Sequence, residues 1–149
     1  MVDVSKKDVT VRAAVAAGSV RTTPEVVGLL HSGALPKGDA LGVARVAGIM
    51  GAKRTPDLVP LCHPIALTSV EVALEPAGDA VAITATVRTA DRTGVEMEAL
   101  TAVATAGLAL IDMIKAVDPA AVLDGVRVLR KEGGKTGLWE RPGAGEVGP

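Results

Sequence analysis

The stretch from residue 95 to residue 117 constrains the fold most, because it is apolar nearly all the way round a helix. Such a pattern predicts a helix that is buried on most sides rather than an amphipathic surface helix. Thr93 and Glu96 have the spacing of a capping box at its start, and Pro119 disfavours helix at Asp118. We therefore expect the rest of the chain to pack around this helix.

A thin polar seam runs along the helix. At about 100° per residue its members fall within an arc of roughly 100°; they are Glu98, Thr101, Thr105, Asp112 and Lys115. Charges on a mostly buried helix must be hydrated, paired or used. We favour use, with Asp112 and Lys115 as neighbours on one face. The alternative is an ordinary helix pair that contributes only a few tenths of a kcal/mol.

Glu98 lies far from this pair, about 21 Å earlier along the helix axis. One small-molecule pocket cannot easily include both ends of one helix. If Glu98 and Asp112 serve the same site, antiparallel helices from two subunits are the simplest way to join them.

Composition limits the class of protein. A chain of 149 residues with 48% apolar content predicts one domain, over residues 1–140, with a disordered tail over residues 141–149. We expect a cytoplasmic protein with no membrane span, and the net charge of −1 gives no argument for nucleic acid. The single cysteine excludes an internal disulfide and a multi-cysteine zinc site. Without Phe or Tyr, the core must be aliphatic.

The remaining pattern alternates between helices and strands. We expect strands over residues 9–16, 68–75, 80–89 and 125–131, the second and third forming an antiparallel hairpin with one solvated face. We expect helices over 23–33 and 39–53, with Thr23 and Asp39 as their N-caps, and a helical turn over 119–123. Gly42, Gly48 and Gly51 in the second helix indicate close packing against another backbone. The elements predict an α+β sandwich with helices on one face of an antiparallel sheet.

Two loops carry candidate chemistry. The proline-rich segment 54–64 must run in an extended or turning path, and it presents Cys62 beside His63. A metal site is poorly supported there, and a hydrogen-bonding or proton-carrying His63 is the better functional interpretation. The glycine segment 133–137 lacks P-loop spacing, although Lys131 and Lys135 remain candidates for phosphate contacts.

Seven segments in this order resemble the cyclic pyranopterin monophosphate synthase family of molybdenum cofactor biosynthesis. Each segment alone is common, but their joint occurrence is specific, and the resemblance covers nearly the whole chain. They are Lys37-Gly38-Asp39, ARVAGIM at 44–50, AKRT at 52–55, LCHP at 61–64, TGVEMEALT at 93–101, DMIKA at 112–116 and GGKTG at 133–137.

The resemblance implies a ferredoxin-like subunit in a homohexamer, a trimer of dimers, with active sites at subunit interfaces. It implies a lyase that converts 3′,8-cyclo-7,8-dihydroguanosine 5′-triphosphate, a GTP-derived small molecule, into cyclic pyranopterin monophosphate and pyrophosphate. No cofactor or protein-bound metal is required, and a magnesium ion carried by the triphosphate is left open.

The resemblance also assigns residues, position by position. The catalytic pair falls on Asp112 and Lys115. The substrate-binding residues fall on Leu61, Cys62, His63, Met97 and Glu98, with Lys37, Glu96 and Lys131 matching charged pocket residues. Many relatives have cysteine where this chain has Ile114, which argues against a chemical role at that position.

Two other classes of protein remain open. A non-catalytic ferredoxin-like binding module would explain the fold and the basic loops but not the charged pair. A metal-dependent phosphoesterase would use Cys62, His63, Asp112 and the glutamates.

Overall fold

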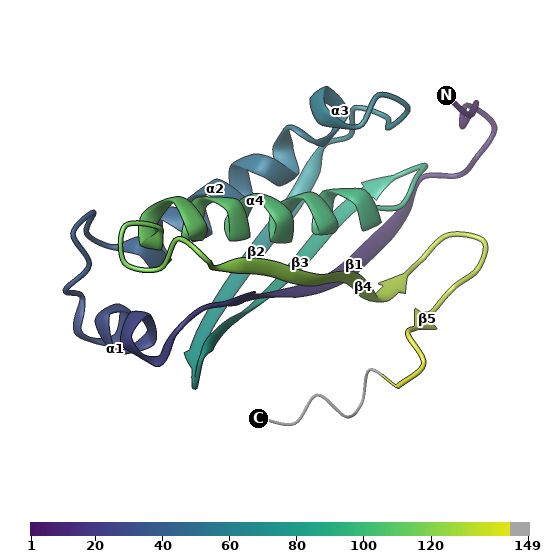
Figure 1. Ribbon diagram of the computed structural model, residues 1–149. Helices are drawn as coiled ribbons and strands as arrows, with labels where there is room; N and C mark the ends of the chain where they lie inside the picture. The colour runs from purple at the N-terminus through teal and green to yellow at the C-terminus, as the bar shows by residue number, and fades with distance from the viewer. Residues whose placement is uncertain (144–149) are drawn as a thin grey trace.

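A computed structural model describes residues 1–143 as one antiparallel sheet with helices (Figure 1). The elements are β1 (Thr10–Arg21), α1 (Pro24–Ser32), α2 (Ala40–Lys53), α3 (Thr55–Leu58), β2 (Leu67–Ala77), β3 (Ala80–Asp91), α4 (Glu96–Ile114), β4 (Val122–Glu132) and β5 (Trp139–Glu140). The strand order is β2-β3-β1-β4-β5. The first four strands have the order of the ferredoxin-like fold, so the predicted α+β sandwich is confirmed.

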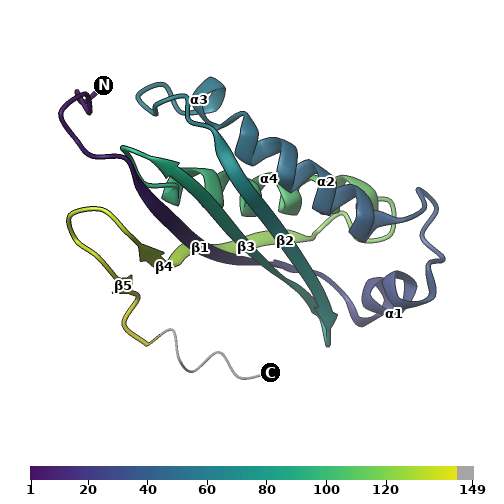
Figure 2. The ribbon, with the colours of Figure 1, turned by 180° about the vertical axis from the view of Figure 1, so that it is seen from behind.

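The sheet is covered by helices on one side. Helices α2 and α4 lie side by side over it in Figure 1, and the face turned to the viewer in Figure 2 carries no helix. Along β3 the helix-facing Val81, Ile83 and Val87 are fully buried, whereas Ala82 and Arg88 on the other face are exposed. The predicted hairpin with one solvated face is therefore confirmed.

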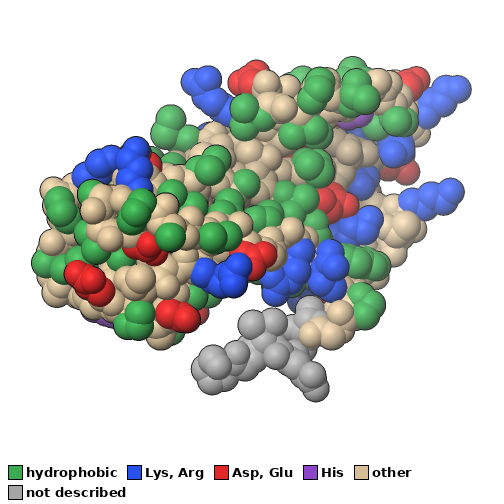
Figure 3. All heavy atoms as spheres, viewed as in Figure 1, with side chains coloured by type: hydrophobic (Ala, Val, Ile, Leu, Met, Phe, Trp, Pro, Cys, Tyr) green, Lys and Arg blue, Asp and Glu red, His purple; other side chains and the backbone are tan. Residues whose placement is uncertain are grey.

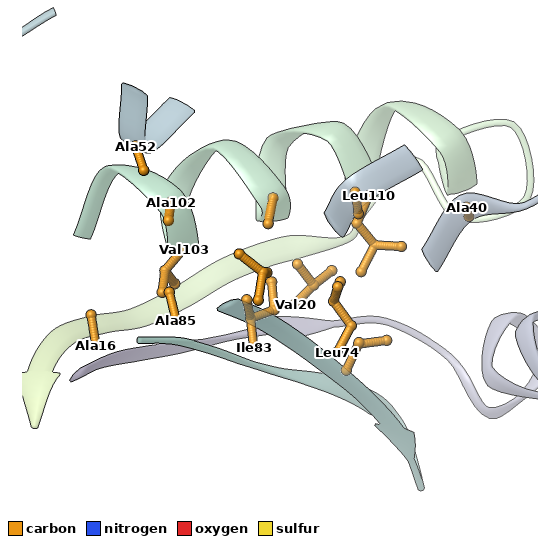
Figure 4. Close-up of a cluster of buried hydrophobic side chains, with 14 of the residues drawn as sticks. Ala16, Val20, Ala40, Ala52, Leu74, Ile83, Ala85, Ala102, Val103 and Leu110 are labelled. Atoms are coloured by element: carbon orange, nitrogen blue, oxygen red, sulfur yellow. The ribbon is translucent and has the colours of Figure 1, made fainter. Parts of the chain in front are cut away.

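The core between the two layers is aliphatic, as the composition requires. Val20, Leu74 and Ile83 rise from the sheet to meet Val103 and Leu110 of α4 (Figure 4). Because no ring fills this space, the helices must lie close to the sheet and to each other.

Close packing of α2 on α4 explains two of the three glycines in α2. A Cβ atom on Gly48 would lie 2.9 Å from the Ala102 carbonyl oxygen, and one on Gly51 would collide with the Thr105 side chain. Gly42 does not serve this contact, because its neighbour is the side chain of Asp39, which caps α2.

The helix starts were predicted correctly for α1 and α2 but not for α4. Thr23 accepts a hydrogen bond from Val26 N at 3.3 Å, and Asp39 accepts one from Gly42 N at 2.9 Å. The capping box at Thr93 and Glu96 is wrong, since Val95 is the N-cap of α4 and no side chain caps it.

Several boundaries differ from the expected ones. Strand β1 continues to Arg21 because its Ala- and Gly-rich second half pairs with β3 and β4 on both sides. The helical turn expected over residues 119–123 is wrong, because β4 already begins at Val122. The segment 54–64 contains the short helix α3, and residues 144–149 of the predicted tail lie outside the described residues.

Helix α4 has the length and hydropathy of a helix that could cross a membrane. It is the only such helix in residues 1–143, and 56% of its most apolar window is buried inside the protein. Its apolar surface is explained by the sheet and α2, which pack against it.

Candidate active site

The predicted catalytic pair forms at the C-terminal end of α4. Lys115 Nζ lies 2.7 Å from Asp112 Oδ1, and Lys37 Nζ lies 2.8 Å from Asp112 Oδ2. Lys37 comes from the loop before α2, so the carboxylate joins two parts of the chain. The sequence predicted the pair within the helix, but the second ammonium on the same carboxylate is a long-range contact.

The two ammonium groups determine the charge of Asp112. Hydrogen bonds from Lys115 and Lys37 lower the pKa of Asp112 to about 2, although about half of its side chain is exposed. A carboxylate with so low a pKa is a weak base at neutral pH, because efficient proton transfer requires a pKa near the working pH. It is well suited to holding two cations beside a substrate.

A second group of residues gathers at the N-terminal end of α4. A cavity of about 350 Å³ there is lined by Leu61, Cys62, His63, Thr93, Gly94, Glu96, Met97 and Glu98. The structure thus brings together the loop and the helix start that the family resemblance assigned to substrate binding. Residues 61–63 and residues 93–98, which are far apart in the sequence, line the same cavity.

Glu98 is the buried charge of this cavity. Its side chain is 3% exposed, and desolvation raises its pKa, with a smaller contribution from the nearby negative charge of Glu96. Burial also raises the pKa of the Cys62 thiol. A thiol with a raised pKa is a poor nucleophile at neutral pH, so Cys62 is better suited to shaping the cavity.

His63 is held by the N-terminal segment. Its Nε2 lies 2.8 Å from the carbonyl oxygen of Val2, and since a carbonyl can only accept, Nε2 carries the proton in this contact. The other ring nitrogen, Nδ1, is thereby the acceptor of the neutral ring.

Glu96 connects this cavity to β4. It pairs with Lys131 at 3.4 Å, with about 30% of each side chain exposed. Its other carboxylate oxygen, Oε2, lies beside Gly94. The capping-box pattern was misleading because α4 begins at Glu96 itself, two residues later than a cap at Thr93 predicts.

A basic cavity lies on the far side of this ion pair. It measures about 240 Å³ and is lined by four cations, Lys7, Arg12, Lys131 and Lys135, and by two carboxylates, Glu96 and Glu132. Figure 3 shows Lys and Arg side chains gathered where β4 ends. Sequence reasoning missed Lys7 and Arg12, since only the pairing of β1 with β4 brings them to the glycine segment.

The two groups do not meet within one chain. Asp112 and Glu98 are at opposite ends of α4, about 21 Å apart along its axis. Among residues 1–143, no three His, Cys, Asp or Glu side chains lie close enough together to hold a metal ion. A phosphoesterase site built from Cys62, His63 and Asp112 therefore does not form in a single copy of the chain.

Comparisons with known proteins agree on one family. The model of the MoaC family matches residues 1–134. The chain is 64% identical over 141 residues to a cyclic pyranopterin monophosphate synthase of Streptomyces griseus, covering 95% of this chain and 80% of that protein.

Two further relatives have the same kind of name. Cyclic pyranopterin monophosphate synthase 2 of Mycobacterium tuberculosis is 62% identical over 141 residues, covering 95% of this chain and 84% of that protein. The cyclic pyranopterin monophosphate synthase of a Nocardioides species is 62% identical over 145 residues, covering 95% of this chain and 89% of that protein.

Proposed function

The chain belongs to the MoaC family, and we propose on this basis that it is a cyclic pyranopterin monophosphate synthase of molybdenum cofactor biosynthesis. It is a lyase that converts 3′,8-cyclo-7,8-dihydroguanosine 5′-triphosphate into cyclic pyranopterin monophosphate and releases pyrophosphate. The identity of 62–64% with the named synthases over 95% of the chain is the observation that carries this proposal.

The proposed active site is shared between two subunits of a homohexamer, a trimer of dimers. The cationic end of one α4, with Lys37, Asp112 and Lys115, meets the Glu98 end of the partner's α4. Within one chain Asp112 and Glu98 are about 21 Å apart, too far to contact one small ligand. Two antiparallel α4 helices from different subunits would bring them to the same ligand, and this supports the arrangement. An isologous dimer would form two such sites at once.

The residue types fit the chemistry. Opening a purine imidazole ring and rebuilding it as a pterin needs repeated proton transfers, for which an ammonium such as Lys115 is a donor and His63 a carrier. Asp112, ionised throughout the neutral range, holds Lys37 and Lys115 in place at 2.8 and 2.7 Å.

Release of pyrophosphate requires stabilisation of negative charge. Lys7, Arg12, Lys131 and Lys135 place four cations around one cavity, against the two carboxylates of Glu96 and Glu132, and this excess of positive charge suits a triphosphate. The protein needs no cofactor of its own in this proposal, and any magnesium ion arrives with the triphosphate. The expected site of action is the cytoplasm, without nucleic acid or membrane partners.

The test is turnover of the purified protein on the cyclic dihydroguanosine triphosphate. The expected result is one pyrophosphate released for each cyclic pyranopterin monophosphate formed. Binding without turnover would instead favour a ligand-binding module. Activity that is lost on exhaustive chelation of protein and buffer, and restored by a transition metal, would favour the phosphoesterase.

A further inference from the structure

Trp139 is the only aromatic residue of the chain. It lies in β5, opposite Lys131 of β4, and 38% of it remains exposed. The core makes no use of it, since the buried cluster is built from residues of other elements. A large apolar ring kept near the surface of a protein without Phe or Tyr needs an explanation.

The ring faces a cavity of about 560 Å³. Its apolar walls are Trp139, Leu138 and Val128, and its charged rim is formed by Glu96, Lys131 and Arg141. An apolar cavity with a few polar groups at its edge is typical of sites that bind planar organic molecules.

This cavity continues into the proposed active site. Glu96 lines it and also lines both the His63 cavity and the basic cavity, and Lys131 and Thr136 are shared with the basic cavity. One ligand seated beside the Glu96–Lys131 ion pair therefore reaches cations on one side and the indole on the other.

One face of the indole is covered by Arg141, which β4 holds in place. The guanidinium carbon of Arg141 lies over the ring at 5.7 Å from its centroid, and Arg141 Nε donates to the Val128 carbonyl oxygen at 2.6 Å. The backbone N–H of Arg141 donates to the Leu129 carbonyl oxygen at 2.8 Å. A ring fixed in this way offers a ligand a preformed stacking surface at a small entropic cost.

We propose that Trp139 stacks on the pyrimidinone ring of the substrate while the neighbouring basic cavity holds its phosphates. This inference rests on the proposed function and adds to it the residue that recognises the base. Trp139 acts in binding, and proton transfer is left to other groups.

Fluorescence gives a direct test, because Trp139 is the sole tryptophan and no tyrosine contributes. The intact wild-type protein is mixed in a stopped-flow instrument with saturating substrate and, separately, with inorganic tripolyphosphate. We expect rapid quenching by the substrate and little change with tripolyphosphate. Equal quenching by both, or none by the substrate, would overturn the stacking.

Steady-state kinetics give an independent test. Base–aromatic stacking predicts that Trp139→Leu raises KM about tenfold and leaves kcat within about twofold, while Trp139→Phe stays near wild type. Val122→Ala, an exposed apolar residue at the opposite end of β4 that lines none of these cavities, is the control and should leave KM unchanged. The thermal unfolding midpoints of all variants check that the substitutions have not disturbed the fold.

The outcomes separate the two claims. A wild-type protein that releases no pyrophosphate would refute the proposed function. A wild-type protein that turns over, with Trp139→Leu unchanged in KM or Trp139→Phe as impaired as Trp139→Leu, would refute the stacking alone.

Discussion

Lys37 Nζ donates to the Asp112 carboxylate at 2.8 Å and to the Asp112 backbone carbonyl oxygen at 3.0 Å. The lysine therefore pairs with the side chain and also caps the last turn of α4, where the helix dipole favours a positive charge. Its loop before α2 is thereby tied to the far end of the central helix.

Removing this ammonium should change the charge of its partner. In Lys37→Met the pKa of Asp112 should rise from about 2 toward 3.8, since one of the two stabilising cations is lost. Carbon-detected NMR titration of the Asp112 carboxyl measures this. Turnover should fall by about 100-fold or more. The control Lys53→Met, at an exposed lysine at the end of α2, should leave the pKa of Asp112 and the turnover rate unchanged.

Neutralising Asp112 should greatly reduce activity but hardly change stability. Asp112→Asn keeps the size of the side chain but no longer holds two cations, so we expect product formation to fall by about 100-fold or more. The thermal midpoint should move little, because exposed ion pairs contribute weakly to stability. Retained turnover would count against the assignment of Asp112.

Glu98 should make stability depend on pH. Burial raises its pKa above 4.5, so its ionised form costs stability above the folded pKa, and this cost disappears as the pH falls to 4.5 and below. Glu98→Gln should therefore melt higher than wild type at pH 7. The difference should shrink as the pH approaches 4.5. A difference that grew toward acid would show that Glu98 is stabilised as a carboxylate.

A shared active site predicts complementation between inactive subunits. A dimer of Asp112→Asn with His63→Ala contains one site without either substitution. Statistical reassembly should therefore restore about a quarter of the sites. Differently tagged subunits, refolded together and assayed for pyrophosphate release, measure the recovery. Mixtures as inactive as either variant would place both residues in the same chain's site.

The glycine contact of α2 predicts a stability difference between two similar substitutions. Gly48→Ala should destabilise by about 1–3 kcal/mol, because the added methyl meets the backbone of α4 at 2.9 Å. Gly28→Ala in α1 meets nothing within 4 Å and should stabilise by about 0.5–1 kcal/mol. Urea unfolding of both variants measures the difference, and equal effects would contradict the close contact.

Features that depend on short-range interactions could be predicted from the sequence, whereas features that depend on long-range contacts could not. Thr23 and Asp39 were identified as caps because a cap acts within one helical turn, and the apolar α4 was recognised from its own periodicity. The capping box at Thr93 and Glu96 was wrong because α4 begins only at Glu96, whose carboxylate pairs with Lys131, far along the chain.

The composition of the candidate site shows the same limit. The sequence singled out His63, Glu98 and Asp112 by residue type and by family resemblance. It could not place Lys7 and Arg12, because their approach to the glycine segment depends on the pairing of the first strand with the fourth. Nor did its helical spacing indicate that Lys37 would reach Asp112.

Strand order also has a consequence for synthesis on the ribosome. The first strand to emerge, β1, occupies the interior of the sheet and exchanges hydrogen bonds with β4, with Ala13 opposite Glu132. Until that late segment leaves the exit tunnel, β1 keeps an open edge that can pair with other chains. A nascent chain therefore remains vulnerable to aggregation until nearly all of its residues have been made.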